Sequence, residues 1–190
     1  MACSLTLAGR GVGCKDALGG IKRIYVSPWV ADEWSWDAIA GTSAGIVDGI
    51  TLASGVTGPV EFYTYDMTRA SGSLNQTITS DLTAGTVFFD QVCSVTFNKQ
   101  APADVAEIAN LVKGRVAVIV QDNNDNWFIM GLKNGVEVTG GTAQTGTAAG
   151  DQNGFTIEFS AQEVSPAPFL AVTANVPDDT DIDIEAAPAA

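Results

Sequence analysis

The sequence predicts a mainly β protein, a β-sandwich or partly closed barrel with one α-helix packed against it. Three observations support this fold class. Runs of β-branched and aromatic residues recur along the chain, only one segment has a convincing helical period, and glycine-rich stretches separate the runs. The length of 190 residues is sufficient for a domain with a sizeable core.

The first half of the chain is predicted to consist of strands and turns. Residues 32–58 contain Trp34 and Trp36 among closely spaced glycines, which indicates short strands and turns. Longer runs of strand-forming residues flank this region, and Pro28 ends or edges the first of them. These predicted strands span residues 21–29, 60–69 and 74–80.

Residues 86–99 predict a long strand with one face in the core and one partly wet. The predicted core face carries Val87, Phe89, Cys93, Val95 and Phe97, and the other face carries Phe88, Asp90, Val92, Ser94 and Thr96.

The predicted helix spans residues 102–113. Pro102 suits a first turn, and acidic side chains at Asp104 and Glu107 favour the positive end of the helix dipole. Lys113 and Gly114 provide a stop signal. The helix carries an apolar stripe that we expect to lie on a sheet. This stripe consists of Val105, Ile108, Ala109 and Val112.

The second half of the chain returns to strands. Residues 115–122 and 127–132 are almost continuously apolar, which is typical of strands buried on both faces. Asn134 and Gly135 form a hairpin signal, so residues 136–139 are predicted to be a returning strand. A long loop at 140–154 follows, and then a strand at 155–164 and an extended segment at 165–170. The core face of that last strand carries Phe155, Ile157, Phe159 and Ala161.

Composition divides the chain into two parts. Residues 1–176 are predicted to form a single β-rich domain with an N-terminal arm, and residues 177–190 a flexible acidic tail. Ile182 and Ile184 could anchor this tail on a neighbour. Its acidic residues are Asp178, Asp179, Asp181, Asp183 and Glu185.

The formal charge of −13 disfavours ordinary DNA binding, because phosphates are repelled by an acidic surface. The chain has no histidine, which removes the commonest general base and metal ligand. We therefore predict a protein that is not an enzyme, with no catalytic residue, no cofactor site and no metal site. Only 16% of residues are charged, which suits a surface covered by neighbouring subunits.

The cysteines Cys3, Cys14 and Cys93 have neither CxxC spacing nor histidine partners, and a zinc site is not expected. We predict free thiols, with a Cys3–Cys14 bridge as the less favoured alternative. The first residues lack the apolar core of a signal peptide, and residues 38–52 are too short to cross a bilayer. These features predict a protein made and used in a cytoplasmic compartment, without a membrane partner.

Three weaker site hypotheses each have a simpler structural explanation. Asp122, Asn123, Asn124 and Asp125 suggest calcium ligands, but Trp127 and Lys133 stand where an EF-hand needs glycine and glutamate, and a hairpin turn is the better interpretation. A glycosidase would need two carboxylates at a fixed separation, and a solvated strand face explains the acids better. The acids are Asp90, Glu137, Glu158 and Glu163. A sugar platform could use aromatic side chains, although core or interface packing is favoured. These aromatics are Trp29, Trp34, Trp36, Tyr63 and Tyr65.

Several segments resemble structural proteins of tailed bacteriophages. The opening carries the pattern GRxxxCKDxxGGIKxxY, and the segment GVEVTGGTAQTGTAAGDQNGFTIEFSAQEVSPAPFL is similar to the far end of such proteins. TVFFDQVCSVTFNKQ, the predicted helix and VAVIVQDNNDNWFIMG fit between them, so the resemblance covers most of residues 3–170. The order of elements is most similar to a tail tube protein.

This resemblance implies a β-sandwich or barrel with a flanking helix, assembled into rings of six that stack into a tube. Long hairpin strands would face the lumen, and the best candidates are residues 60–80 and 86–97. The expected partners are copies of the chain and other virion proteins, while DNA passes without specific binding. The expected location is the virion tail, assembled in the host cytoplasm. The loop 140–154, the N-terminal arm and the acidic tail are the segments expected to bridge rings.

Two alternatives remain at this point. The first is another virion role, such as a head-decoration, connector or tail-terminator protein. The second is a carbohydrate-binding β-sandwich that uses the tryptophans.

Overall fold

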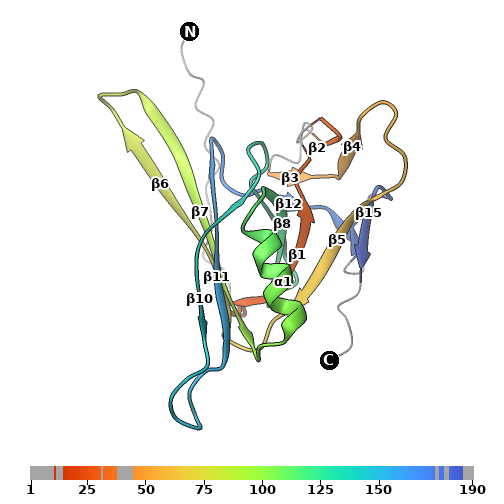
Figure 1. Ribbon diagram of the computed structural model, residues 1–190. Helices are drawn as coiled ribbons and strands as arrows, with labels where there is room; N and C mark the ends of the chain where they lie inside the picture. Colours follow the sequence, from red (N-terminus) through yellow and green to blue (C-terminus); the bar gives the residue numbers. More distant parts are fainter. Residues whose placement is uncertain are drawn as a thin grey trace.

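The computed structural model describes residues 11, 15–30, 32–37, 45–173, 176–177 and 180–185. Two sheets pack face to face and α1 (Pro102–Leu111) flanks them (Figure 1). This arrangement confirms the mainly β class, a sandwich-like fold with one helix. Cys3 and Cys14 lie outside the described residues, whereas Cys93 is buried and free.

One sheet has seven strands and the other has four. The seven-stranded sheet runs in the spatial order β15 (Ile182–Glu185), β5 (Val60–Asp66), β1 (Ile21–Pro28), β8 (Val116–Asp122), β9 (Trp127–Met130), β12 (Phe169–Leu170) and β3 (Ile46–Val47). The four-stranded sheet runs β10 (Glu137–Gln144), β11 (Gly154–Glu163), β7 (Thr86–Asn98) and β6 (Gly72–Asp81). Two small ribbons complete the described strands, β2 (Trp34–Trp36) with β4 (Ile50–Leu52) and β13 (Val172–Thr173) with β14 (Val176–Pro177).

Strand β8 is buried on both faces, as its continuous apolar run predicts. Val118 and Val120 face the four-stranded sheet, where they join a core that contains Cys93 and Phe159. Ile119 faces the opposite way, into a second core that is built largely from aromatic side chains. That second core includes Tyr25, Trp34, Trp36, Phe62 and Trp127. The seven-stranded sheet is therefore covered on both sides.

The predicted alternation of the long strand is confirmed in the middle of β7, but Val87, which was predicted to lie in the core, is exposed because the strand extends past the covering sheet there. Cys93 and Val95 are buried, while Val92 and Ser94 on the other face are partly exposed. Strand β11 alternates in the same way, and the pairing of Phe159 with Cys93 aligns the two core faces.

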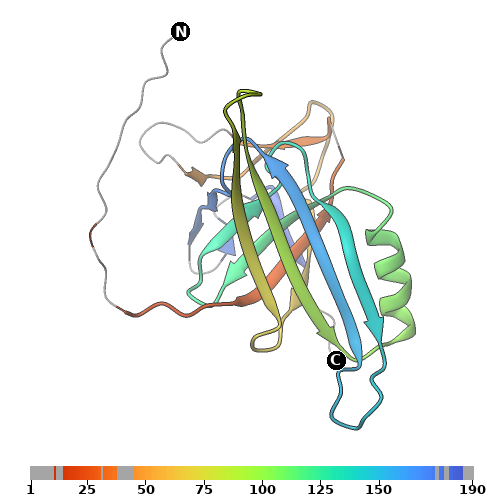
Figure 2. The ribbon, with the colours of Figure 1, turned by 90° about the vertical axis from the view of Figure 1, so that its left-hand side faces the viewer.

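The helix exists where it was predicted, but its apolar stripe was assigned to the wrong contact. Ile108 and Leu111 pack against the core, whereas Val105 and Val112 remain more than half exposed. The reason is that α1 lies over the gap between the two sheets and does not lie flat on either one (Figure 2). The start of the helix follows the prediction, because the Asp104 carboxylate accepts the backbone N–H of Ala101 at 3.0 Å.

The predicted hairpin at 133–135 is wrong. β9 and β10 belong to different sheets, so the loop between them crosses from one layer to the other. The predicted loop at 140–154 is also too long, because residues up to Gln144 pair with β11 and only 145–153 form the loop. The small residues of this stretch have weak strand propensity, and cross-strand pairing outweighs it.

The acidic segment expected to be a flexible tail contributes a strand at Ile182–Glu185. β15 runs parallel to β5, with Ile182 opposite Val60. The Ile182 side chain is buried in the second core, the one that contains Ile119, and Ile184 is half-buried beside it. Both isoleucines therefore act as anchors, but on the body of their own chain.

Gly154 provides a test of the β7–β11 packing. A Cβ at Gly154 would lie 1.9 Å from the carbonyl oxygen of Phe97, whereas a Cβ at Gly150 would meet nothing within 4 Å. We expect Gly154→Ala to lower the free energy of unfolding by about 1–3 kcal/mol, measured by urea denaturation. Gly150→Ala is the matched control. Equal stability of the two variants would contradict this packing.

Candidate functional site

The four-stranded sheet presents one whole face away from the core, and we call it the outer face (Figure 2). Because successive side chains of a strand alternate, the residues between the buried positions of β7 and β11 all point this way. Most are small and polar. In the central strands they are Phe88, Asp90, Val92, Ser94, Thr96, Thr156, Glu158, Ser160 and Gln162, with Asn75, Thr77 and Thr79 alongside on β6.

This face has no positive charge of its own. The strands β6, β7, β10 and β11 contain no lysine or arginine, although they contain several acids. The Asp90 carboxylate is held by Gln162 Nε2 at 2.8 Å and by Thr79 Oγ1 at 3.2 Å. A cation from outside the sheet reaches one strand end, where Arg115 Nε lies 2.9 Å from Glu137 Oε1. The surface is therefore polar and acidic.

Both edge strands of the four-stranded sheet, β6 and β10, lack a strand partner on their outer side in the described part of the chain, and α1 lies alongside β10 (Figure 2). An unpaired edge offers a row of backbone donors and acceptors to another chain, and proteins that avoid such pairing commonly place lysine or proline there. Neither edge strand contains either residue. These edges are suited to pairing with further strands.

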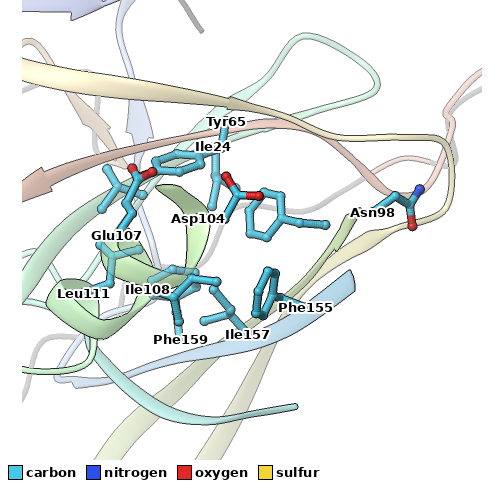
Figure 3. A pocket seen from close by; sticks show the side chains of 12 residues that line it. Ile24, Tyr65, Asn98, Asp104, Glu107, Ile108, Leu111, Phe155, Ile157 and Phe159 are labelled. Atoms are coloured by element: carbon cyan, nitrogen blue, oxygen red, sulfur yellow. The ribbon is translucent and has the colours of Figure 1, made fainter. Parts of the chain in front are cut away.

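An apolar cavity of about 180 Å³ lies between α1 and the two sheets (Figure 3). Ile24, Ile157 and Phe159 contribute to its walls, and the carboxylates of Asp104 and Glu107 stand on the helix side. The Tyr65 hydroxyl donates to Glu107 Oε1. Burial, and then this carboxylate, raise the pKa of Tyr65, so the phenol stays protonated and acts as a donor.

The residues considered as calcium ligands form the turn between β8 and β9, as the hairpin interpretation predicted. The Asp122 Oδ1 atom accepts the backbone N–H groups of Asn124 and Asn126, each at 2.8 Å. Burial alone would raise the pKa of Asp122, but the hydrogen bonds from Asn126 and Asn124 together lower it. Among the described residues, no group of three or more acidic or cysteine side chains is arranged to hold a metal ion.

The same turn holds the start of the described chain. Asn124 Oδ1 accepts the N–H of Leu18 at 2.7 Å, and Asn124 Nδ2 donates to the Leu18 carbonyl at 2.8 Å. Asn123 Nδ2 donates to the Gly19 carbonyl at 2.7 Å. The asparagines therefore fix residues 18–19 against the end of the seven-stranded sheet.

The four candidate carboxylates are not gathered into one site. Glu163 is buried on the core side, and Glu137 is engaged by Arg115. Asp90 and Glu158 share the outer face. Glu158 pairs with Ser94, which is four residues along β7 from Asp90, so the two acids are about 13 Å apart along the strands. That separation exceeds the one at which a glycosidase acts.

The aromatic residues considered as a sugar platform divide between core and surface. Trp34 and Trp36 are buried with Phe62, and Trp29 packs edge-on against Trp34. Tyr65 lines the cavity under α1, whereas Tyr63 is exposed. The indole faces needed for stacking on a sugar are thus used inside the protein.

The sequence analysis did not predict the burial of Gln91, and it wrongly placed Glu163 on a solvated strand face, because both side chains are buried. Gln91 Oε1 accepts the N–H of Gly131 at 3.1 Å, and Glu163 Oε1 accepts those of Lys133 and Asn134 at 2.9 and 2.8 Å. These bonds hold the loop that crosses between the sheets and thereby place the start of β10. Both residues occupy core-facing positions in otherwise apolar strand faces, which is the signal that could have identified them.

Comparison of the chain with models of known protein families, with curated proteins and with solved structures finds no match. No helix in the described residues is both long enough and apolar enough to span a membrane.

Asp122 gives the β8–β9 turn a predictable pH dependence. A lowered pKa in the folded state stabilises the protein above the unfolded pKa near 4, and this contribution is lost as the pH falls through the folded value. We expect Asp122→Ala to cost about 1 kcal/mol at pH 7 and less below pH ~3, measured by denaturation at each pH. Asp122→Asn, which keeps the turn acceptor, is the control. A deficit in Asp122→Ala that does not change with pH would contradict the assignment.

Proposed function

We propose that this chain is a non-enzymatic structural subunit that assembles with copies of itself into stacked rings, forming the tail tube of a bacteriophage virion through which DNA passes. The observation that supports the proposal is the four-stranded sheet, which combines two edge strands without a described strand partner and an outer face free of lysine and arginine.

The two edge strands support closure into a ring. The four strands are antiparallel throughout, so β6 and β10 run in opposite directions. Pairing β6 of one copy with β10 of the next would continue the antiparallel order, and this contact joins two different patches, as a closed ring requires. Six copies with strands about 4.8 Å apart would enclose a barrel about 35 Å across between backbones, which admits duplex DNA.

The charge of the outer face supports its assignment to the lumen. DNA binds proteins without sequence preference mainly by releasing counterions when lysine and arginine contact its phosphates. A wall of hydroxyl, amide and carboxylate groups gives no such release, so DNA can move along it. Of the segments expected to face the lumen, residues 60–66 belong to the seven-stranded sheet, whereas β6 and β7 belong to the four-stranded sheet. Under this proposal the β6–β7 hairpin lines the lumen.

The direct test is negative-stain microscopy of the purified full chain over a range of concentration and ionic strength. The proposal predicts rings and hollow tubes of constant diameter. A protein that remains monomeric under all conditions would overturn it. Isolated rings without tubes, or binding of the chain to capsid shells, would support a connector, terminator or decoration role instead.

A second prediction identifies the lining of the tube. We expect Glu158→Lys to give tubes that retain short duplex DNA, with binding that weakens steeply as salt increases, because the new charge lies on the outer face. Asp183→Lys, an equal change on exposed β15, is the matched control. A fluorescent oligonucleotide that co-sediments with the tubes provides the measurement. If tubes of both variants retained the same amount of DNA, the outer face would not line the lumen.

A further inference from the structure

The β6–β7 hairpin extends past the rest of the sandwich (Figure 1, upper left). β11 pairs with β7 as far as Phe89, opposite Glu163, and the hairpin continues beyond that level. Near its root, Gln76 Oε1 accepts the N–H of Ala167 at 2.8 Å and ties β6 to the body. We call residues 78–87 the hairpin tip.

The hairpin tip exposes apolar side chains that continue the core face. Ile78 pairs with Phe89 and Val87 with Ser80, so both lie on the same side of the hairpin as buried Cys93. No layer of the sandwich reaches far enough to cover them, and Ile78 is 66% exposed and Val87 55%. Leu82, at the turn, is 97% exposed. Together they make a small apolar knob in water, which favours contact with another surface.

The knob is accompanied by one negative charge. Asp81 Oδ1 accepts the backbone N–H groups of Thr83 and Ala84 at 2.7 and 3.1 Å, which shapes the turn. The same hydrogen bonds lower the pKa of Asp81, so its carboxylate is ionised at neutral pH.

Two exposed cations stand at the opposite end of the same two strands, where the carboxylate of Asp104 also lines the cavity under α1. Arg69 precedes β6 and Lys99 follows β7, and a hydrogen bond from Asn98 Nδ2 to Thr68 Oγ1 at 3.4 Å brings their segments together. Both side chains are exposed, and neither joins an ion pair with a described residue. Half-buried Phe97 and exposed Asn98 line the cavity under α1 at this end. We call this region the base end.

We infer that the hairpin tip of one copy docks onto the base end of a second copy, with Leu82 covered and Asp81 opposite Arg69 and Lys99. The complementary charges stand at opposite ends of the same two strands, so the contact is head to tail and repeats along the strand direction. Edge pairing between β6 and β10 joins neighbours around a ring, whereas this contact joins successive rings. The inference rests on the proposed self-assembly and names the contact that turns rings into a tube.

Leu82→Ser is the first test. Leu82 is almost fully exposed in the single chain, so its replacement leaves the fold intact, which circular dichroism and thermal melting verify. We expect rings to form while the fraction of protein in sedimentable tubes falls at least tenfold. Tubes of wild-type length and yield from Leu82→Ser would overturn the inference while leaving the proposed function in place.

The charge contribution has its own pair of variants. Asp81→Asn keeps the turn acceptor and removes the charge, and it is expected to weaken stacking. Asp48→Asn is the control, because it removes the same charge at an exposed position that lies outside the four-stranded sheet and outside the segments expected to bridge rings. Tube formation that falls equally in both variants would count against the contact.

A charge exchange tests the pairing itself. Arg69→Glu combined with Lys99→Glu is expected to stop assembly at rings, and adding Asp81→Lys to the same chain is expected to restore tubes. Failure of the triple variant to recover, while its rings still form, would overturn the pairing. A wild-type chain that never assembles would instead remove the proposed function, and the inference with it.

Discussion

The structure depends on the burial of β8 on both of its faces. One set of alternate valines forms the core shared with the four-stranded sheet, and Ile119 enters the aromatic core on the other side. A strand of this kind must be covered twice, so the seven-stranded sheet becomes a middle layer. The four-stranded sheet and α1 cover one side, and the tryptophan-bearing β2–β4 ribbon, with its neighbours, covers the other. The tryptophans are therefore committed to packing and are not offered to a ligand.

The same constraint leaves the four-stranded sheet with only one face in the core. Its other face meets no part of the described chain, and its two edge strands lack the lysine and proline that commonly block edge pairing. A single chain leaves these backbone groups to water, whereas a ring of copies would satisfy them. The absence of lysine and arginine from this sheet has little consequence for folding, but it matters for a wall along which a polyanion moves.

Much of the architecture was predictable from local pattern. The alternation around Cys93 predicted which face of β7 lies in the core, and the apolar run before Asp122 predicted that β8 is buried on both faces. The hairpin predicted at Asn134–Gly135 was wrong because a strong turn signal does not determine which strand the chain will pair with after the turn. The crossing loop is instead held by buried backbone N–H groups that donate to Gln91 and Glu163, two residues distant from the loop in sequence. The acidic residues around Ile182 suggested a tail, and the pairing of β15 with β5 could not be read from their composition. The outer face, by contrast, followed from alternation once β7 and β11 were known to pair.

The central claim is that the edge strands of the four-stranded sheet pair between copies. Hydrogen–deuterium exchange, compared between assembled and dissociated full-length protein, tests it most directly. The account predicts that amides of β6 and β10 become strongly protected on assembly, while those of β8 are slow in both states. Unchanged exchange in β6 and β10, with new protection confined to the outer strands β15 and β3 of the seven-stranded sheet, would contradict it.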